Sequence, residues 1–238
     1  LPVGAWGAWG DSRRTGYEFN WARSGAVSYN ARFDQAPGVV AQLESGRVSH
    51  VLIQIGINDL NNGLAMDLYL GRAVNVGAID AIADNIVATA RLVNDAAPGR
   101  VIVASTQDYL GLDLLPDPEN GLFIDQAGRQ RVIQAFAELN ARVRDNLPAG
   151  VIWFDWNAAL SARLTSIRQG DVFWLDGQAV SIRVRGNGPF NGFIQDAYMH
   201  PETALSGIYA QLFLNEMKVV WGLDLPTLTD AEIMRRAQ

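Results

Sequence analysis

The chain contains two histidines, His50 and His200, so a general base that uses imidazole near neutral pH must be one of them. His200 lies in the segment QDAYMHPE, just ahead of an expected helix, with Asp196 four residues earlier. A carboxylate at this spacing can orient an imidazole ring and stabilise its charged form. His200 and Asp196 are therefore candidates for a general base and its orienting acid, with a surface histidine as the alternative. His50 opens an apolar run and is interpreted as a partly exposed residue at a strand end.

Residues that could stabilise a developing negative charge occur in two other segments. In IGINDL, residues 55–60, Asn58 and Asp59 directly follow an apolar run that is typical of a buried strand. Polar residues there lie at the carboxyl edge of a parallel sheet, where active sites form, and the Asn58 amide could face an oxyanion. The alternative is an ordinary turn. In NWARSGAVS, residues 20–28, Gly25 could offer a backbone N–H close to a ligand.

The elements that must position these residues alternate along the chain. Apolar runs predict strands, and apolar residues that recur at intervals of three and four predict helices. The expected strands are residues 50–56, 100–105 and 150–156, with helices over residues 79–93, over residues 132–147 and from Pro201 onward. Strands that alternate with such helices form βαβ units. The chain is therefore predicted to be an α/β protein with a parallel sheet and helices on both faces.

Three segments depart from this alternation. Residues 172–184 (VFWLDGQAVSIRV) have Asp-Gly between two strand-like arms and are predicted to form a hairpin. Residues 110–124 contain two prolines and are expected to form a loop near the strand ends, where α/β proteins place their ligand sites. Residues 223–238 are interpreted as an appended C-terminal helix or linker, which leaves residues 1–222 as the main domain.

Taken together, these motifs resemble the blocks of the SGNH (GDSL-type) esterase and lipase family of serine hydrolases. Gly25 in NWARSGA matches the family's second block, and residues 56–59 (GIND) match its third block, Gly-x-Asn-Asp. His200 with Asp196 approximates the fourth block, Asp-x-x-His. The order and the spacing of the three blocks agree with the family pattern across residues 20–220.

The resemblance implies a three-layer α/β/α sandwich, the flavodoxin-like fold of SGNH hydrolases, with a five-stranded parallel sheet. It also implies hydrolysis of carboxylic esters through an acyl-serine intermediate, with no metal or organic cofactor. His200 would act as the general base and Asp196 as its orienting acid. The Gly25 N–H and the Asn58 amide would complete the oxyanion hole beside the N–H of the nucleophile itself.

The nucleophile of the first block is the part of the family pattern that fits least. Residues 10–12 read Gly-Asp-Ser, but only twelve residues separate Ser12 from Gly25. A strand crossover needs about a dozen residues or more, and these twelve must also contain an expected strand over residues 17–22 (YEFNWA). Ser12 is therefore interpreted as a chance match, and the first βα unit with the true nucleophile is expected to precede Leu1. An active enzyme that uses Ser12 is the alternative.

The orienting acid is a second departure, because the family's acid lies three residues before the histidine and Asp196 lies four before His200. Either a one-residue bulge lets the carboxylate reach the ring, or His200 uses a backbone acceptor. A hypothesis of another class is a non-catalytic, carbohydrate-binding module on the same scaffold. In that case some of the seven tryptophans would stack on sugar rings.

Composition limits the partners. A net charge of −6 without a basic run argues against nucleic acid, and no apolar stretch reaches the roughly 18 residues of a membrane span. Cysteine is absent, which excludes a thiolate nucleophile and a cysteine-based metal site. The expected substrate is a small-molecule, lipid or acylated-carbohydrate ester. Because residue 1 is Leu and not Met, the chain is expected to be a processed product or fragment, and the family resemblance implies that it is secreted or periplasmic.

Overall fold

The structure, a computed structural model, describes residues 11, 16–61, 63–75, 77–112, 124–170, 172–181, 201 and 203–237. The chain divides into two compact units, the first built from Leu1–Leu110 and Phe123–Trp156 and the second from Gly111–Leu122 and Asn157–Gln238. In chain order the described elements are α1 (Ser28–Asn30), the π-helical segment η2 (Ala31–Gln35), α2 (Ala36–Glu44), β1 (Val51–Ile53), α3 (Ile57–Asn61), α4 (Leu64–Tyr69), α5 (Ala78–Ala96), β2 (Val101–Ala104), α6 (Gln126–Asn146), β3 (Val151–Phe154), α7 (Trp156–Ile167), β4 (Arg168–Gln169), β5 (Val172–Leu175), β6 (Gln178–Val180), α8 (Thr203–Trp221) and α9 (Asp230–Ala237).

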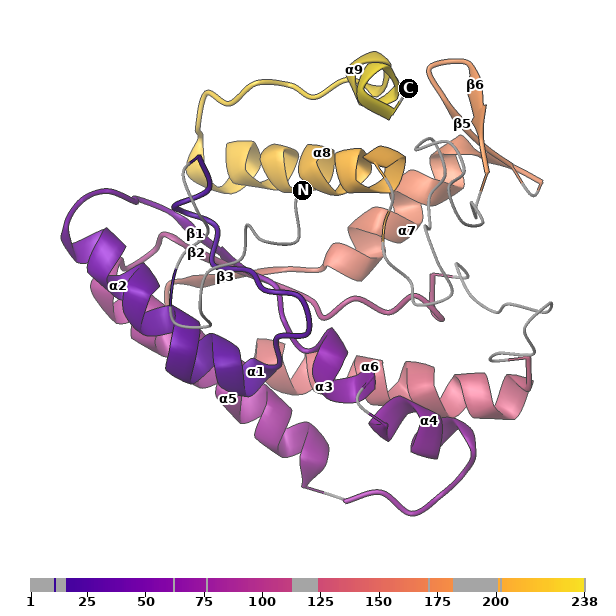
Figure 1. Cartoon of the computed structure of the whole chain (residues 1–238), viewed down its shortest axis with the longest axis horizontal. Coiled ribbons are helices and arrows are strands. Elements are labelled where there is room, and N and C mark those ends of the chain that lie inside the picture. Colours follow the sequence, from indigo (N-terminus) through magenta and orange to yellow (C-terminus); the bar gives the residue numbers. More distant parts are fainter. Residues whose placement is uncertain are drawn as a thin grey trace. The chain divides into compact units, whose positions relative to one another are not determined.

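A parallel sheet in the order β1–β2–β3 forms the centre of the first unit (Figure 1). Val51 pairs with Val101, and Val101 pairs with Val151 on its other side. Because β2 lies between two strands, all four of its residues are at most 3% exposed. The prediction of three parallel strands is confirmed, and the chain is a mixed α/β protein.

Helices α2, α5 and α6 pack side by side in the first unit (Figure 1). Helix α5 buries the apolar residues that recur along its sequence, among them Ile82, Ile86 and Val93. It ends where Pro98 and Gly99 follow, as the sequence predicts. Helix α6 begins at an N-cap, because the Asp125 side chain accepts a hydrogen bond from the Gly128 N–H at 2.5 Å. These helices support the sheet that carries the Asn58 segment.

The second unit contains an antiparallel sheet in the order β4–β5–β6. Asp176 (φ 50°) and Gly177 (φ 71°) are both left-handed, as a two-residue type I′ turn requires. The predicted hairpin is therefore confirmed over its described part. Helix α8 begins two residues after Pro201 and packs on α9. Glycine at position 207 permits this contact, because a Cβ there would lie 2.7 Å from Ile233 Cγ2.

The prediction of a strand over residues 17–22 is wrong. This segment forms a turn, in which the Asn20 N–H donates to the Tyr17 carbonyl at 2.9 Å. A strand needs a neighbour that completes its ladder of hydrogen bonds, and no described segment pairs with residues 17–22. Side-chain contacts fix the segment instead: Trp21 Nε1 donates to Gln42 Oε1 at 3.0 Å.

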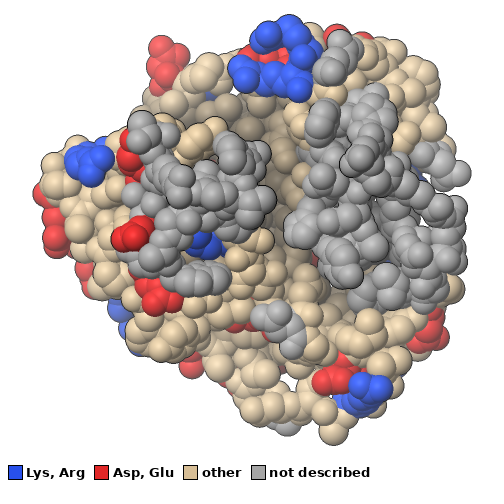
Figure 2. Space-filling view, viewed as in Figure 1, with Lys and Arg blue, Asp and Glu red and all other residues tan. Residues whose placement is uncertain are grey.

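Charged side chains of both signs are interspersed on the face drawn in Figure 2. None of the helices in the described part of the chain combines the length and the apolar character that crossing a membrane requires.

Candidate functional site

The segment around Gly25 forms a tight turn. The Ala26 N–H donates to the Arg23 carbonyl at 3.2 Å, and Gly25 has φ +77°, as the third residue of a type II turn requires. A Cβ at this position would meet no atom within 4 Å, so glycine is needed here for its backbone conformation and not for space. Gly25 is exposed, and its N–H has no acceptor among the described residues. The turn therefore presents a donor of the kind that an oxyanion hole uses.

The third block lies where β1 passes into α3. Gly56 has φ +114°, and a Cβ there would come within 2.6 Å of Thr106 Oγ1. Glycine is therefore required at this position for two reasons, its backbone conformation and the close approach of Thr106, which follows β2. The sharp change of direction places Asn58 and Asp59 on the first turn of α3.

Two sets of hydrogen bonds join the second block to the third. Asn58 Nδ2 donates to the Ala26 carbonyl at 2.9 Å. The Asp59 carboxylate accepts from the Ser28 backbone N–H at 2.7 Å and from Ser28 Oγ at 2.6 Å. The structure therefore brings together the Gly25 turn and Asn58, which lie more than 30 residues apart in the sequence. Sequence reasoning missed Ser28, whose role depends on this contact.

Burial raises the pKa of the Asp59 carboxyl above its ordinary value, and the hydrogen bonds from Ser28 act in the opposite direction without cancelling the effect. A carboxyl whose pKa is higher in the folded chain contributes stability below its unfolded pKa of about 3.9. That contribution is lost as the pH rises through the folded pKa.

We therefore expect the free energy of unfolding of the wild type to fall, relative to Asp59→Asn, as the pH rises from about 3.9 through the raised pKa. The asparagine can still accept from the Ser28 N–H and can donate to Ser28 Oγ, so it preserves the contact without the titrating group. Urea unfolding of both proteins across this pH range measures the difference. If the free energies of unfolding of the two proteins changed in parallel with pH, Asp59 would ionise in the folded chain as it does in the unfolded chain.

A polar segment directly after β2 completes this edge of the sheet. Residues 105–108 (STQD) are all at most 7% exposed. Thr106 Oγ1 donates to the Ile55 carbonyl at 2.8 Å, and Gln54 Nε2 donates to the Ser105 carbonyl at 3.3 Å. These bonds connect the ends of β1 and β2. A polar run that directly follows an apolar strand is the sequence signal for this segment, and the predicted site does not include it.

The Asn140 side chain on α6 binds both the N–H and the carbonyl of Thr106. Its Oδ1 accepts from the Thr106 N–H at 2.7 Å, and its Nδ2 donates to the Thr106 carbonyl at 3.0 Å. In Asn140→Ala both backbone groups lose this partner inside the protein, so we expect a loss of about 2–5 kcal/mol in the free energy of unfolding. Urea unfolding measures it. Asn146→Ala is the matched control on the same helix, since the Asn146 side chain donates to the Arg142 carbonyl in an exposed hydrogen bond; an equal loss in both would contradict the prediction.

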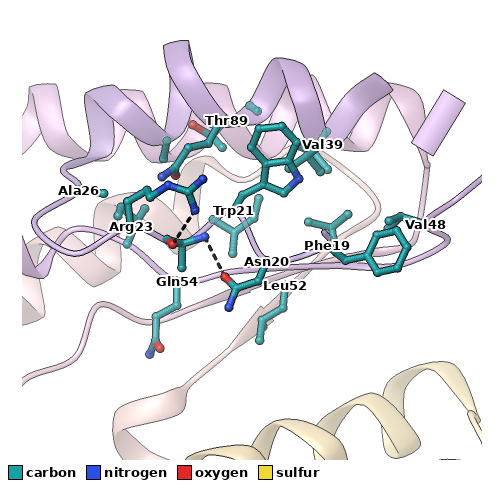
Figure 3. Close-up of a pocket in the computed structure, with 18 of the residues that line it drawn as sticks. Phe19, Asn20, Trp21, Arg23, Ala26, Val39, Val48, Leu52, Gln54 and Thr89 are labelled. Atoms are coloured by element: carbon teal, nitrogen blue, oxygen red, sulfur yellow. Dashed lines mark hydrogen bonds between the residues drawn. The ribbon is translucent and has the colours of Figure 1, made fainter. Parts of the chain in front are cut away.

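A cavity of about 490 Å³ opens beside these residues in the first unit. It lies among residues 19–23, α2, α5 and β1, and Figure 3 labels Trp21, Thr89 and Leu52, which line it from different elements. Three polar side chains from the carboxyl edge of the sheet also line it: Gln54, Asn58 and Gln107. The cavity is within the size range of small-molecule sites.

His50 lies immediately before β1 and is partly exposed, as the sequence analysis expects. Its Nδ1 lies 2.9 Å from Ser49 Oγ. Burial, with a smaller contribution from the Arg100 charge, lowers the pKa of His50 below its ordinary value. The lowered pKa favours the neutral form of the ring.

The other predicted catalytic residues, Ser12, Asp196 and His200, lie outside the described residues, as does most of the loop over residues 110–124. Within the described part of the chain, no group of three or more histidine or carboxylate side chains is placed to hold a metal ion. No family model, no curated protein and no solved structure matches this chain.

Proposed function

We propose that the chain is a carboxylic-ester hydrolase of the SGNH type, with its parallel sheet in a three-layer α/β/α sandwich. The observation that supports this most is the hydrogen bond from Asn58 Nδ2 to the Ala26 carbonyl. It fixes the Asn58 amide beside the Gly25 turn. In this proposal the amide and the Gly25 N–H, which come from separate segments, donate to one anion. An oxyanion hole needs such an arrangement before the reaction begins, because preorganised donors cost no reorganisation in the transition state.

In the proposed mechanism a serine hydroxyl attacks the ester carbonyl, and the carbonyl oxygen becomes an oxyanion. An amide nitrogen carries two hydrogens, so Asn58 can donate one to Ala26 and the other to this oxyanion. The Gly25 N–H donates the second hydrogen bond. His200, oriented by Asp196, takes the serine proton and passes it to the leaving alcohol. A water molecule then hydrolyses the acyl-serine with His200 again acting as the base.

Fluorophosphonate labelling followed by peptide mapping tests the proposal. We expect a labelled serine in a chain extended by the segment that the family resemblance places before Leu1, and its labelling should slow by about 10⁴-fold or more in His200→Ala. His50→Ala is the matched control and should label as the wild type does. A label on Ser12 that disappears in Ser12→Ala would identify the nucleophile and overturn the interpretation of Ser12 as a chance match.

The oxyanion donors can also be tested without a nucleophile. Methylphosphonate carries a tetrahedral anion that resembles the intermediate, and we expect its binding, followed by NMR titration, to depend on Asn58. Binding that Asn58→Ala abolishes supports the oxyanion hole even if no serine is labelled. The absence of both labelling and Asn58-dependent binding would overturn the proposed function.

A further inference from the structure

The cavity of the first unit lies between two backbone segments that do not pair with each other. Residues 19–23 line one side and residues 51–55 line another (Figure 3). Among the described residues, no backbone hydrogen bond joins Phe19–Trp21 to Leu52–Ile55. Folded interiors leave few voids larger than a water molecule. The cavity of about 490 Å³ is open to solvent and has room for a ligand.

Among the described residues, no strand lies on the side of β1 that faces away from β2. The Val51 N–H donates to the Arg100 carbonyl at 2.9 Å, which directs residues 51 and 53 towards β2. In a parallel ladder the residues between them direct both backbone groups to the opposite side. Leu52 and Gln54 therefore present N–H and carbonyl groups away from β2, and within the described structure no strand other than β2 pairs with β1.

This edge lacks the features by which proteins protect exposed strands. Edge strands usually carry a charge, a proline or a bulge, whereas β1 reads Val-Leu-Ile. The Leu52 side chain is 38% exposed, although its register partner Ile102 on β2 is fully buried. Such an apolar sequence is typical of a strand that is covered by a neighbour on each side.

A buried donor on the cavity lining also requires an acceptor. Gln35 is 8% exposed, and its Nε2 is buried without a hydrogen-bond partner among the described residues. A buried donor that lacks an acceptor carries a free-energy cost. An occupant that carries carbonyl oxygens would remove that cost, which a purely hydrocarbon ligand would not.

We infer that this cavity binds an extended, uncharged peptide segment, which adds a strand to the sheet parallel to β1. Backbone groups of the segment would pair with Leu52 and Gln54, and apolar side chains would fill the space against Val39 and Val93. On its other side the segment would supply the neighbour that residues 17–22 lack. The strand pattern of YEFNWA, which forms a turn in this structure, is then explained as a strand that forms on binding.

The direction of the added strand connects this inference to the candidate site. A parallel strand ends at the same edge of the sheet as β1, so its last residue would lie near Asn58 and the Gly25 turn. This connection rests on the proposed function, in which the nucleophile must occupy this position. Binding of the strand, however, depends on the cavity alone and does not require Asn58.

A peptide that copies residues 101–106 (VIVAST), with its ends blocked by acetyl and amide groups, is a suitable probe, because this segment is uncharged and already pairs with β1 in parallel. Residue-resolved hydrogen exchange is measured by NMR with and without the peptide. At ten times the dissociation constant, we expect exchange of the Leu52 and Gln54 amides to slow by about tenfold. The Ile53 amide, which faces β2, serves as the internal control and should not change.

Two matched variants sharpen the test. A control peptide with proline at the positions of Ile102 and Val103 loses a donor on each edge, so it should not slow exchange. Leu52→Pro in the protein removes the outward donor of β1, and we expect the slowing at Gln54 to be lost while Ile53 keeps its protection. In Asn58→Ala the slowing should persist, which separates this inference from the proposed function.

Three results would overturn the inference. Unchanged exchange at Leu52 and Gln54 with millimolar peptide would show that the edge does not accept a strand. Equal slowing by the proline peptide would indicate an apolar ligand pocket without strand pairing. If exchange of the Leu52 and Gln54 amides slowed without peptide as the protein concentration rose, the occupant would be a second copy of the chain.

Discussion

Replacing Asn58 by alanine is expected to slow ester hydrolysis by about 100- to 1000-fold, the effect of removing one donor from an oxyanion hole. The Asn58 amide is oriented by its 2.9 Å hydrogen bond to the Ala26 carbonyl and lines the cavity at the carboxyl edge of the sheet. The loss should appear mainly in kcat, because the oxyanion exists only in the transition state and intermediate. Hydrolysis of p-nitrophenyl acetate and the rate of fluorophosphonate labelling both measure it.

Two controls separate loss of the donor from loss of structure. Asn61→Ala changes an exposed asparagine on the same helix and should leave the rate unchanged. Ser28→Ala removes the hydrogen bond from Ser28 Oγ to Asp59 but keeps the Asn58 donor, so we expect a loss of less than about tenfold. If Asn58→Ala retained the wild-type rate while folded, Asn58 would have no part in catalysis.

Sequence patterns predicted the parallel strands and the long helices correctly because these depend on local periodicity. The apolar run at residues 51–53 and the recurring residues Ile82, Ile86 and Val93 each specify an element and its buried face. The same reasoning failed for residues 17–22. Their strand-like composition is local, but a strand exists only when another strand completes its hydrogen bonds.

The candidate site was predicted only in part, because contacts between distant segments connect its components. The resemblance to the third block identified Asn58 and Asp59, and Gly25 was identified from the second block. Nothing in the sequence indicates that Ser28 donates to Asp59 across 31 positions or that Asn140 binds Thr106 across 34. These partners are polar residues whose roles follow from the packing of α3 and α6, which no local pattern encodes.

Gly56→Ala is expected to destabilise the fold by about 2–6 kcal/mol, the sum of a strained backbone and a steric conflict. The residue has φ +114°, which side chains rarely adopt, and the added Cβ would lie 2.6 Å from Thr106 Oγ1. Thr106 cannot easily move away, because that hydroxyl donates to the Ile55 carbonyl at 2.8 Å. Urea unfolding measures the loss.

The backbone and steric contributions can be separated with variants of the same chain. Gly63 has φ +99°, and a Cβ there would meet no atom within 4 Å, so Gly63→Ala should cost only the backbone strain, about 1–3 kcal/mol. Thr106→Ala removes the atom that Gly56→Ala would strike. The double variant Gly56→Ala/Thr106→Ala should therefore be less destabilised than the sum of the single variants. Strict additivity would mean that Gly56 is required for its backbone conformation alone.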